Sequence, residues 1–258
     1  MKIQQLHQMY FSPTGTTKKV LEILAQEIGR NGQQIDLTLK QDVKYHFTAN
    51  DVVVFGIPVY SGRVPRTAVE RLTHLKGENT PVILVAAYGN RAYDDALLEL
   101  KKLMEVRGFL VVAAVAAVCE HSIVPSIAAG RPDEADVKKI KEFAQQIMKK
   151  IDALQSWKEM PKLEVKGNPQ FCEYKNVPLK PKASASCVKC GICAENCPAG
   201  AISKENPSLT DTSLCISCMR CVRNCPKQAR SVSGIMQMAA KMMLQGKCKQ
   251  RKEPELFV

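Results

Sequence analysis

Two runs of cysteines decide how this chain is organised: Cys187-Val-Lys-Cys190-Gly-Ile-Cys193-Ala-Glu-Asn-Cys197-Pro198 and Cys215-Ile-Ser-Cys218-Met-Arg-Cys221-Val-Arg-Asn-Cys225-Pro226. Both runs have the spacing Cys-x2-Cys-x2-Cys-x3-Cys-Pro, and each cysteine of the second lies 28 positions after its counterpart, as 187 and 215 do. The region is therefore an internal duplication. It holds eight of the chain's 11 cysteines.

The spacing within each run predicts iron–sulfur clusters. Three thiolates this close together can hold three irons of one cubane, and the fourth cysteine, which precedes proline, is directed elsewhere. In the bacterial two-cluster pattern the fourth cysteine binds the other cluster. We therefore expect two [4Fe–4S] clusters with crossed ligands. One set is Cys187, Cys190, Cys193 and Cys225, and the other is Cys215, Cys218, Cys221 and Cys197.

Disulfides and zinc sites are the alternatives to clusters. The N-terminus has no apolar core of the kind that a secretory signal has, so we expect a cytoplasmic chain, whose thiols stay reduced. Zinc ligands usually come as two separate pairs that close one tetrahedron, and not as two matched runs of four. Both alternatives therefore fit the pattern less well than clusters do.

Residues 184–230 resemble a bacterial two-cluster [4Fe–4S] ferredoxin, with Gly191 after the second cysteine and a proline after each fourth one. The resemblance implies a small α+β domain. It also implies that this domain passes one electron at a time.

Residues 1–154 alternate strand-like and helix-like segments. Strands are expected at 4–11, 35–39, 52–57, 82–87 and 109–118, and helices at 16–28, 67–75, 92–106 and 136–154. This alternation predicts an α/β fold with a doubly wound, five-stranded parallel sheet. Its ligand crevice should lie at the carboxyl ends of the strands.

The loop Phe11-Ser12-Pro13-Thr14-Gly15-Thr16-Thr17 lies between the first strand and the first helix. Its hydroxyls, its glycine and the amides at the start of the helix suit a phosphate group. An ordinary Ser/Thr cap and turn is the alternative.

Residues 1–154 resemble flavodoxin, whose phosphate loop has the form Ser/Thr-x-Thr-Gly-x-Thr. The resemblance implies FMN, with its phosphate at Ser12, Thr14, Gly15, Thr16 and Thr17. Two later loops would then hold the isoalloxazine ring. Their expected contacts are Pro58, Tyr60, Tyr88, Gly89, Asn90, Arg91 and Tyr93.

The ring loops differ from those of flavodoxins in charge and in aromatic content. Tyr93 falls where flavodoxins place a stacking tyrosine and Tyr60 where the opposite face is covered, although both could be ordinary surface tyrosines. The first ring loop lacks tryptophan. Arg91 would stabilise a reduced, anionic flavin, so we do not expect the very low potential of a free flavodoxin.

The remaining segments are a linker and a tail. Residues 155–183 are rich in Pro and Lys and predict a linker. Residues 231–258 begin with a Met-rich helical pattern, whose apolar stripe we expect to pack against the core. Cys119, Cys172, Cys248 and His121 are interpreted as filler or loop residues rather than ligands.

Together the two resemblances match the flavodoxin–ferredoxin fusion proteins of anaerobic bacteria and archaea, and they imply an electron relay. The formal net charge of +12 suggests an acidic redox partner protein, and an ordinary solvated basic surface is the alternative. A flavin-dependent reductase of a small organic substrate or quinone, fed by ferredoxin or NAD(P)H, and a redox-sensing interaction module are the alternatives. Neither a nucleic-acid motif nor a membrane-spanning run is visible, and a homodimer stays open.

Overall fold

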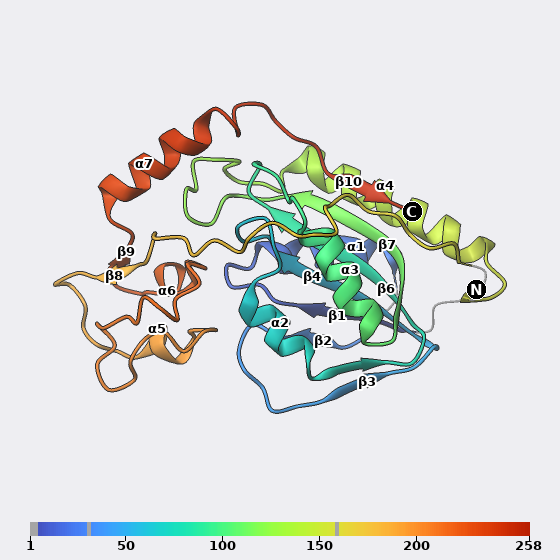
Figure 1. The fold of residues 1–258 in the computed structure, drawn as a ribbon, viewed down its shortest axis with the longest axis horizontal. Coiled ribbons are helices and arrows are strands. Elements are labelled where there is room, and N and C mark those ends of the chain that lie inside the picture. Colours follow the sequence, from blue (N-terminus) through green and yellow to red (C-terminus); the bar gives the residue numbers. More distant parts are fainter. Residues whose placement is uncertain (1–4, 30–31, 158–159) are drawn as a thin grey trace.

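The computed structural model describes residues 5–29, 32–157 and 160–258. Figure 1 shows a central sheet with helices on both of its faces and a smaller lobe to one side. The strand order in the sheet is β10-β7-β6-β4-β1-β2. Its members are β1 (Gln5–Tyr10), β2 (Gln34–Asp36), β4 (Asp51–Pro58), β6 (Thr80–Tyr88), β7 (Phe109–Val118) and β10 (Glu255–Phe257).

Five of these strands are parallel, which confirms the doubly wound sheet expected from the sequence. The chain order reverses between β1 and β4, and such a switch point is where α/β sheets open a ligand crevice. The whole of β6 is buried, because helices cover both faces of the sheet.

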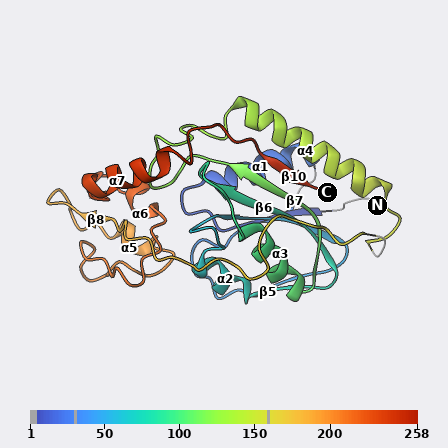
Figure 2. The same ribbon diagram turned by 45° about the horizontal axis from the view of Figure 1, so that its top comes forward.

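Each face of the sheet has its own pair of helices (Figure 2). One face carries α1 (Thr16–Ile28) and α4 (Glu134–Ala153), and the other carries α2 (Arg66–Leu72) and α3 (Ala96–Val106). The apolar positions of α1 that the sequence predicts to face the core, such as Val20 and Leu24, are fully buried. None of the helices in the described ranges combines the length and apolar character needed to cross a membrane.

Three short strands were not expected from the sequence. β3 (Tyr45–Phe47) and β5 (Leu75–Gly77) form a separate parallel pair. β10 comes from the C-terminus and pairs antiparallel with β7, at the edge of the main sheet. The sheet therefore has six strands, of which the last is supplied by the tail.

The smaller lobe contains the duplicated cysteine region. Its elements are β8 (Lys182–Ala183), α5 (Ile192–Glu195), α6 (Arg220–Arg223) and β9 (Arg230–Ser231), with β8 and β9 antiparallel. The duplication is visible in the backbone, because α5 follows Gly191 and α6 follows Met219, both in the left-handed conformation. These two residues are 28 positions apart, as the cysteines are.

The segment predicted as a linker is held against the sheet domain. The indole Nε1 of Trp157 donates to the carbonyl of Ala49 at 3.2 Å, and Leu163 is buried in the core. The amide of Cys172 donates to Oδ2 of Asp95 at 2.6 Å. This segment is therefore a strap and not a free tether.

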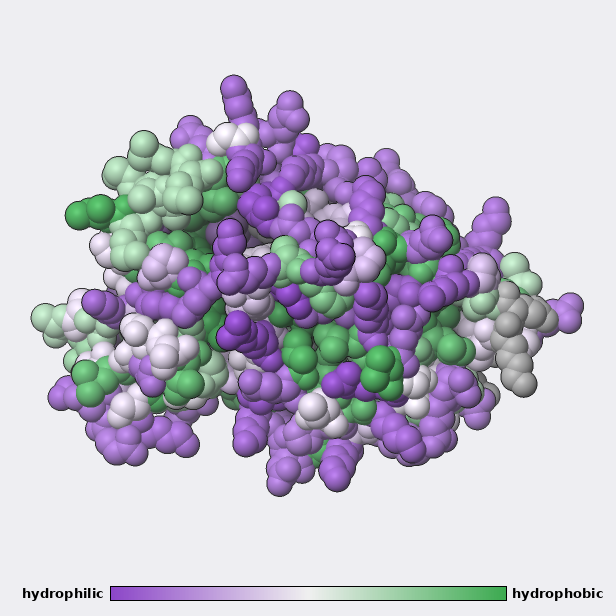
Figure 3. Space-filling view, viewed as in Figure 1, coloured by the Kyte–Doolittle hydropathy of each residue, from purple (hydrophilic) through white to green (hydrophobic). Residues whose placement is uncertain are grey.

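The Met-rich pattern does form a helix, α7 (Gly234–Gln245), but the prediction that it packs against the core is wrong. None of its residues is buried, and Ile235, Met238 and Met242 are 83%, 66% and 70% exposed. The apolar atoms at the upper left of Figure 3 lie over this helix. α7 is placed beyond the sheet because the chain must cross from the cysteine lobe back to β10.

Candidate cofactor sites

A pocket of about 500 Å³, which we call the sheet-end pocket, lies at the carboxyl ends of β4, β6 and β7 and the start of α1. Thr14 and Thr16 of the predicted phosphate loop line it, together with Pro58 and Tyr60 after β4. Further lining residues come from the two later strand ends. They are Tyr88, Gly89, Arg91 and 119–124.

The predicted phosphate loop is shaped by its own hydrogen bonds. The amide of Lys18 donates to Oγ of Ser12 at 3.1 Å, and the amide of Ser12 donates to Oγ1 of Thr38 at 2.8 Å. Gly15 has φ of 84°, a left-handed conformation that other residues rarely adopt. Ser12 therefore shapes the loop from behind, while Thr14 and Thr16 face the pocket.

The donors of this loop fit a phosphate. In the part of the chain that the structure describes, the backbone amides of Thr14, Thr16 and Thr17 donate to no protein acceptor. The first turn of α1 has no acidic residue that would repel an anion. Free amides at a helix start bind anions well.

Close packing behind the loop fixes its position. A Cβ added to Gly56 would lie 2.3 Å from Cδ1 of Leu21 and 2.9 Å from Cγ2 of Thr17. Thr17 is therefore used to pack α1 against β4, and it lies outside the lining of the sheet-end pocket.

The first ring loop turns tightly beside the pocket. Tyr60 and Arg63 exchange two backbone hydrogen bonds of 3.0 Å, with Ser61 and Gly62 both at positive φ between them. Both Nε and Nη2 of Arg63 donate to Glu99 at 2.7 Å, which anchors the turn to α3. Burial raises the pKa of Tyr60 well above its ordinary value, and the nearby Cys218 adds to this.

Some residues of the second ring loop line the sheet-end pocket, and others contact the C-terminal tail. Tyr88, Gly89 and Arg91 line the sheet-end pocket. Arg91 forms an ion pair with Asp94, so its charge is partly neutralised. Burial raises the pKa of Tyr88 to about 12, which keeps this phenol neutral.

The structure places Asn90 and Tyr93 outside the pocket lining, which corrects two expected ring contacts. Asn90 is buried, and its Nδ2 donates to the carbonyls of Cys248 and Gln250 at 2.9 and 3.0 Å. Tyr93 is buried in the core, and its hydroxyl donates to Glu255 of β10. Both residues therefore attach the C-terminal tail, which the sequence analysis did not place here.

Residues far from the sheet close the pocket, and sequence reasoning missed them. The strap contributes Val177–Leu179 and the cysteine lobe contributes Ile216 and Ser217. α7 contributes one side, through Met236, Ala239, Ala240, Met243 and Leu244. The Met-rich periodicity predicted an apolar side for this helix, but not that the side would face a pocket.

His121 and Cys119, which the sequence analysis discounted, also line the pocket. Nδ1 of His121 accepts the amide of Val124 at 3.1 Å, and burial lowers the pKa of the imidazole. Burial raises the pKa of the Cys119 thiol to about 12. Both groups are therefore neutral near pH 7 and do not bring charge to the pocket.

The eight cysteines of the duplicated runs surround two small cavities in the cysteine lobe. We call the cavity lined by Cys187, Cys190, Cys193 and Cys225 the outer cysteine cavity. The inner cysteine cavity is lined by Cys197, Cys215, Cys218 and Cys221. Nowhere in the described ranges do three or more His, Cys, Asp or Glu side chains form a site for a single metal ion.

The burial of the thiols in these cavities fits a role as ligands of iron–sulfur clusters. Burial raises the pKa of Cys218 to about 12 and that of Cys221 to about 11. Thiolates at such positions need a cation to compensate them, and the irons of a cluster supply it.

The inner cysteine cavity adjoins the sheet-end pocket. Ile216, between Cys215 and Cys218, lines both of them. Two arginines join the lobes beside this residue. Nη1 of Arg220 donates to the carbonyl of Pro13 at 3.1 Å, and Nη2 of Arg71 donates to that of Pro198 at 2.9 Å.

Comparison with known proteins supports two domains. A family model described as a flavodoxin domain matches residues 9–95, and one described as a 4Fe-4S dicluster domain matches residues 186–230. No curated protein matches the chain.

Solved structures similar to the chain include two flavodoxins and one oxidoreductase. Oxidised flavodoxin 1 from Bacillus cereus is 14% identical over 57% of this chain and 98% of its own, with a TM-score of 0.40. A flavodoxin from the domain Archaea is 15% identical over 58% and 99%, with a TM-score of 0.41. Rubredoxin oxygen:oxidoreductase from Desulfovibrio gigas is 16% identical over 58% and 37%, with a TM-score of 0.40.

The two matched domains support a role in electron transfer that uses a flavin and iron–sulfur chemistry. With the parallel sheet and the duplicated cysteine lobe, they show that the chain joins a flavodoxin domain to a 4Fe-4S dicluster domain, which fits a flavodoxin–ferredoxin fusion.

Proposed function

We propose that this chain relays electrons between FMN in the sheet-end pocket and two [4Fe–4S] clusters, and exchanges them with an external protein. FMN exchanges one or two electrons and each cluster exchanges one. The protein binds these groups, orients them and sets their electrostatic surroundings.

The phosphate loop and the ring loops would hold FMN. Thr14, Thr16 and the unpaired amides of the loop suit the phosphate, and Tyr60 and Tyr88 line the space for the ring. The apolar side of α7, which lines the pocket, would exclude water from the bound flavin. Because burial keeps His121, Cys119 and Tyr88 neutral, the charged side chains of the pocket lining are Glu120, Lys247 and Arg91, the last of which is paired with Asp94.

The two cysteine cavities would hold one cluster each, with the crossed ligand sets that the spacing predicts. The lining of the cavities supports this, since each contains three cysteines of one run and the fourth of the other. A single observation carries the relay: Ile216 lines both the sheet-end pocket and the inner cysteine cavity, so the two are adjacent. The flavin and the inner cluster would thus be neighbours within one chain.

The outer cluster would then face the external partner. Around its cavity Val188 and Ile192 are 60% and 36% exposed, and Lys189 and Lys227 are exposed beside them. Eight cysteinates and two oxidised cores add about −4, which leaves the chain with its clusters near +8, before the phosphate of FMN is counted. An acidic redox protein fits such a surface.

The substitution Cys190→Ser tests the two proposed ligand sets. Anaerobically prepared wild-type protein should contain about eight irons and one FMN per chain. Cys190→Ser should lose about half of the iron and of the cluster absorption but keep FMN, because the altered thiol lines only the outer cavity.

Cys172→Ser is the matched control, since Cys172 is exposed and lines neither cavity. Full iron content in Cys190→Ser would refute the ligand sets, and wild-type protein with zinc and no flavin would refute the proposed function. Saturable, selective turnover of a small acceptor by reduced protein would instead support the reductase alternative.

A further inference from the structure

A buried arginine beside the outer cysteine cavity has no acidic partner among the described residues. Arg230 is 2% exposed. Its Nη1 donates to Oγ1 of Thr210 at 2.9 Å, its Nη2 donates to the carbonyl of Pro207, and its Nε has no partner among the described residues. Neither hydrogen bond goes to a carboxylate.

A buried cation of this kind is strongly destabilising unless an anion compensates it. Arg230 lines the outer cysteine cavity with Cys187, Cys190, Cys193 and Cys225. Among the side chains that line this cavity, the cysteine thiolates are the ones that can carry a negative charge.

The internal duplication shows what Arg230 replaces. The residue 28 positions earlier is Ile202, which is 4% exposed and lines the inner cysteine cavity. Equivalent positions of two matched cradles thus hold a buried cation in one and an aliphatic side chain in the other. The thiolate ligands alone would make the two sites similar, so this pair breaks their symmetry.

The other cations that the structure describes near the lobe do not place a second buried charge in the lining of either cysteine cavity. Lys189 and Lys227 also line the outer cavity, but both are exposed and screened by solvent. On the inner side, Arg71, Arg220 and Lys180 donate to the carbonyls of Pro198, Pro13 and Cys215, but none of the three lines either cysteine cavity.

We propose that Arg230 makes the outer cluster easier to reduce than the inner one. This rests on the ligand sets of the proposed function. Reduction by one electron adds one negative charge to a cluster, and a buried cation beside it stabilises that charge more than an isoleucine does. The electron would therefore be held preferentially at the cluster that is farther from the flavin and nearer the external partner.

Redox titration followed by electron paramagnetic resonance tests this on the fully loaded protein. Arg230→Ile and Arg230→Gln should lower the midpoint potential of the outer cluster and shift that of the inner cluster less. Arg230→Lys should keep most of the wild-type value because it keeps the charge. Arg223→Gln removes an exposed charge from the same lobe and should change neither potential.

The same substitutions in the Cys190→Ser background, which keeps only the inner cluster, assign the shift to its cluster. An unchanged outer potential in Arg230→Ile and Arg230→Gln, with both clusters present, would overturn the proposal. If the neutral variants lose half of their iron, retention by Arg230→Lys supports a need for charge, and loss from it too would overturn the proposal. Wild-type protein without two clusters would instead contradict the proposed function.

Discussion

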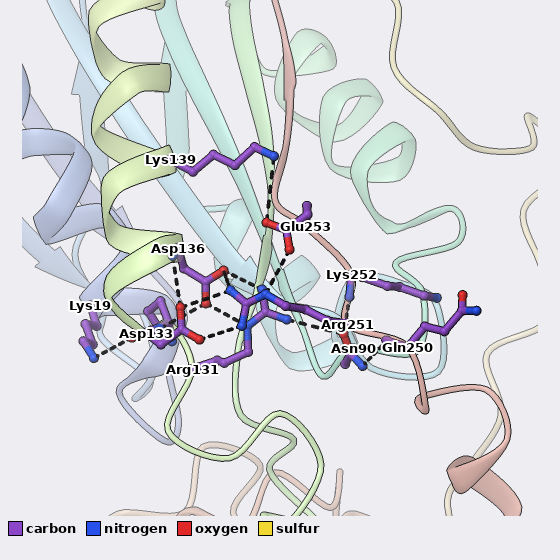
Figure 4. Close-up of polar contacts among 11 residues, drawn as sticks. Lys19, Asn90, Arg131, Asp133, Asp136, Lys139, Gln250, Arg251, Lys252 and Glu253 are labelled. Carbon is purple, nitrogen blue, oxygen red and sulfur yellow. Dashed lines mark hydrogen bonds and ion pairs between the residues drawn. The ribbon is translucent and has the colours of Figure 1, made fainter.

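At the scale of single residues, Arg251 shows how the tail is attached to the sheet domain (Figure 4). Its guanidinium donates to Asp133 at 2.6 Å and to the fully buried Asp136 at 3.1 Å. Arg131 binds the same Asp136 at 2.5 and 2.7 Å. The network fixes the segment between α7 and β10. It thereby also fixes α7, which forms one side of the sheet-end pocket.

This network should respond to acid. The hydrogen bonds from Arg251 hold the pKa of Asp133 well below its ordinary value. A lowered pKa means that the attachment is complete above about pH 4 and is lost as the pH falls further. Hydrogen exchange in β10, corrected for its intrinsic rate, should therefore accelerate below about pH 4.

Arg251→Ala should remove this acid dependence and speed exchange in β10 about two- to fivefold at pH 7, as a loss of about 0.5–1 kcal/mol implies. Lys249→Ala removes an exposed charge from the same tail that forms no ion pair within the described ranges, and it should behave as wild type. Equal exchange in the three proteins at every pH would contradict the anchoring role.

Residue types could be predicted from the sequence better than their partners. The cysteine spacing predicts both cavity linings, because the ligands of each cluster lie close together in sequence except for the fourth. Asn90 and Tyr93 were placed on the right loop, yet their partners are Gln250 and Glu255, about 160 positions away. No local pattern shows such a contact.

At the scale of elements, periodicity and continuous apolar runs predicted most of the sheet domain. The bounds of α1 and β7 agree with the sequence analysis, because both have unbroken patterns and clear ends. β10 is only three residues long, and its pairing with β7 depends on the path of the whole tail. α7 was predicted as a helix but not where it would lie, since its apolar side has no sequence feature that distinguishes a core from a cofactor pocket.

Two methionines of α7 allow the side of the helix that lines the sheet-end pocket to be compared with the side that does not. Met236 lines the sheet-end pocket and Met238 does not. Met236→Glu should weaken FMN binding about tenfold, because a carboxylate facing an apolar pocket costs on the order of 1–2 kcal/mol. Met238→Glu should leave the FMN dissociation constant unchanged, as measured by quenching of FMN fluorescence. Equal affinities in the two variants would mean that α7 does not cover the flavin.

At the scale of the whole molecule, three connections place the cysteine lobe against the sheet domain. The strap runs along one side, and the anchored tail carries α7 along another (Figure 1). The third connection is a pair of arginines, of which Arg220 joins the lobe to the phosphate loop and Arg71 joins α2 to Pro198 of the lobe. The inner cysteine cavity is thereby held next to the sheet-end pocket, and this arrangement allows both cofactor sites to work in one chain.

Rapid reduction of the flavin, followed by absorption at the cluster band, tests this arrangement most directly. Anaerobic protein with full FMN and iron content would be given less than one electron per chain and observed at several protein concentrations. A relay within one chain predicts that the clusters bleach as the flavin is reoxidised, with a first-order rate constant that does not change with protein concentration. Clusters that stay oxidised, or a rate that rises in proportion to protein concentration, would contradict the account.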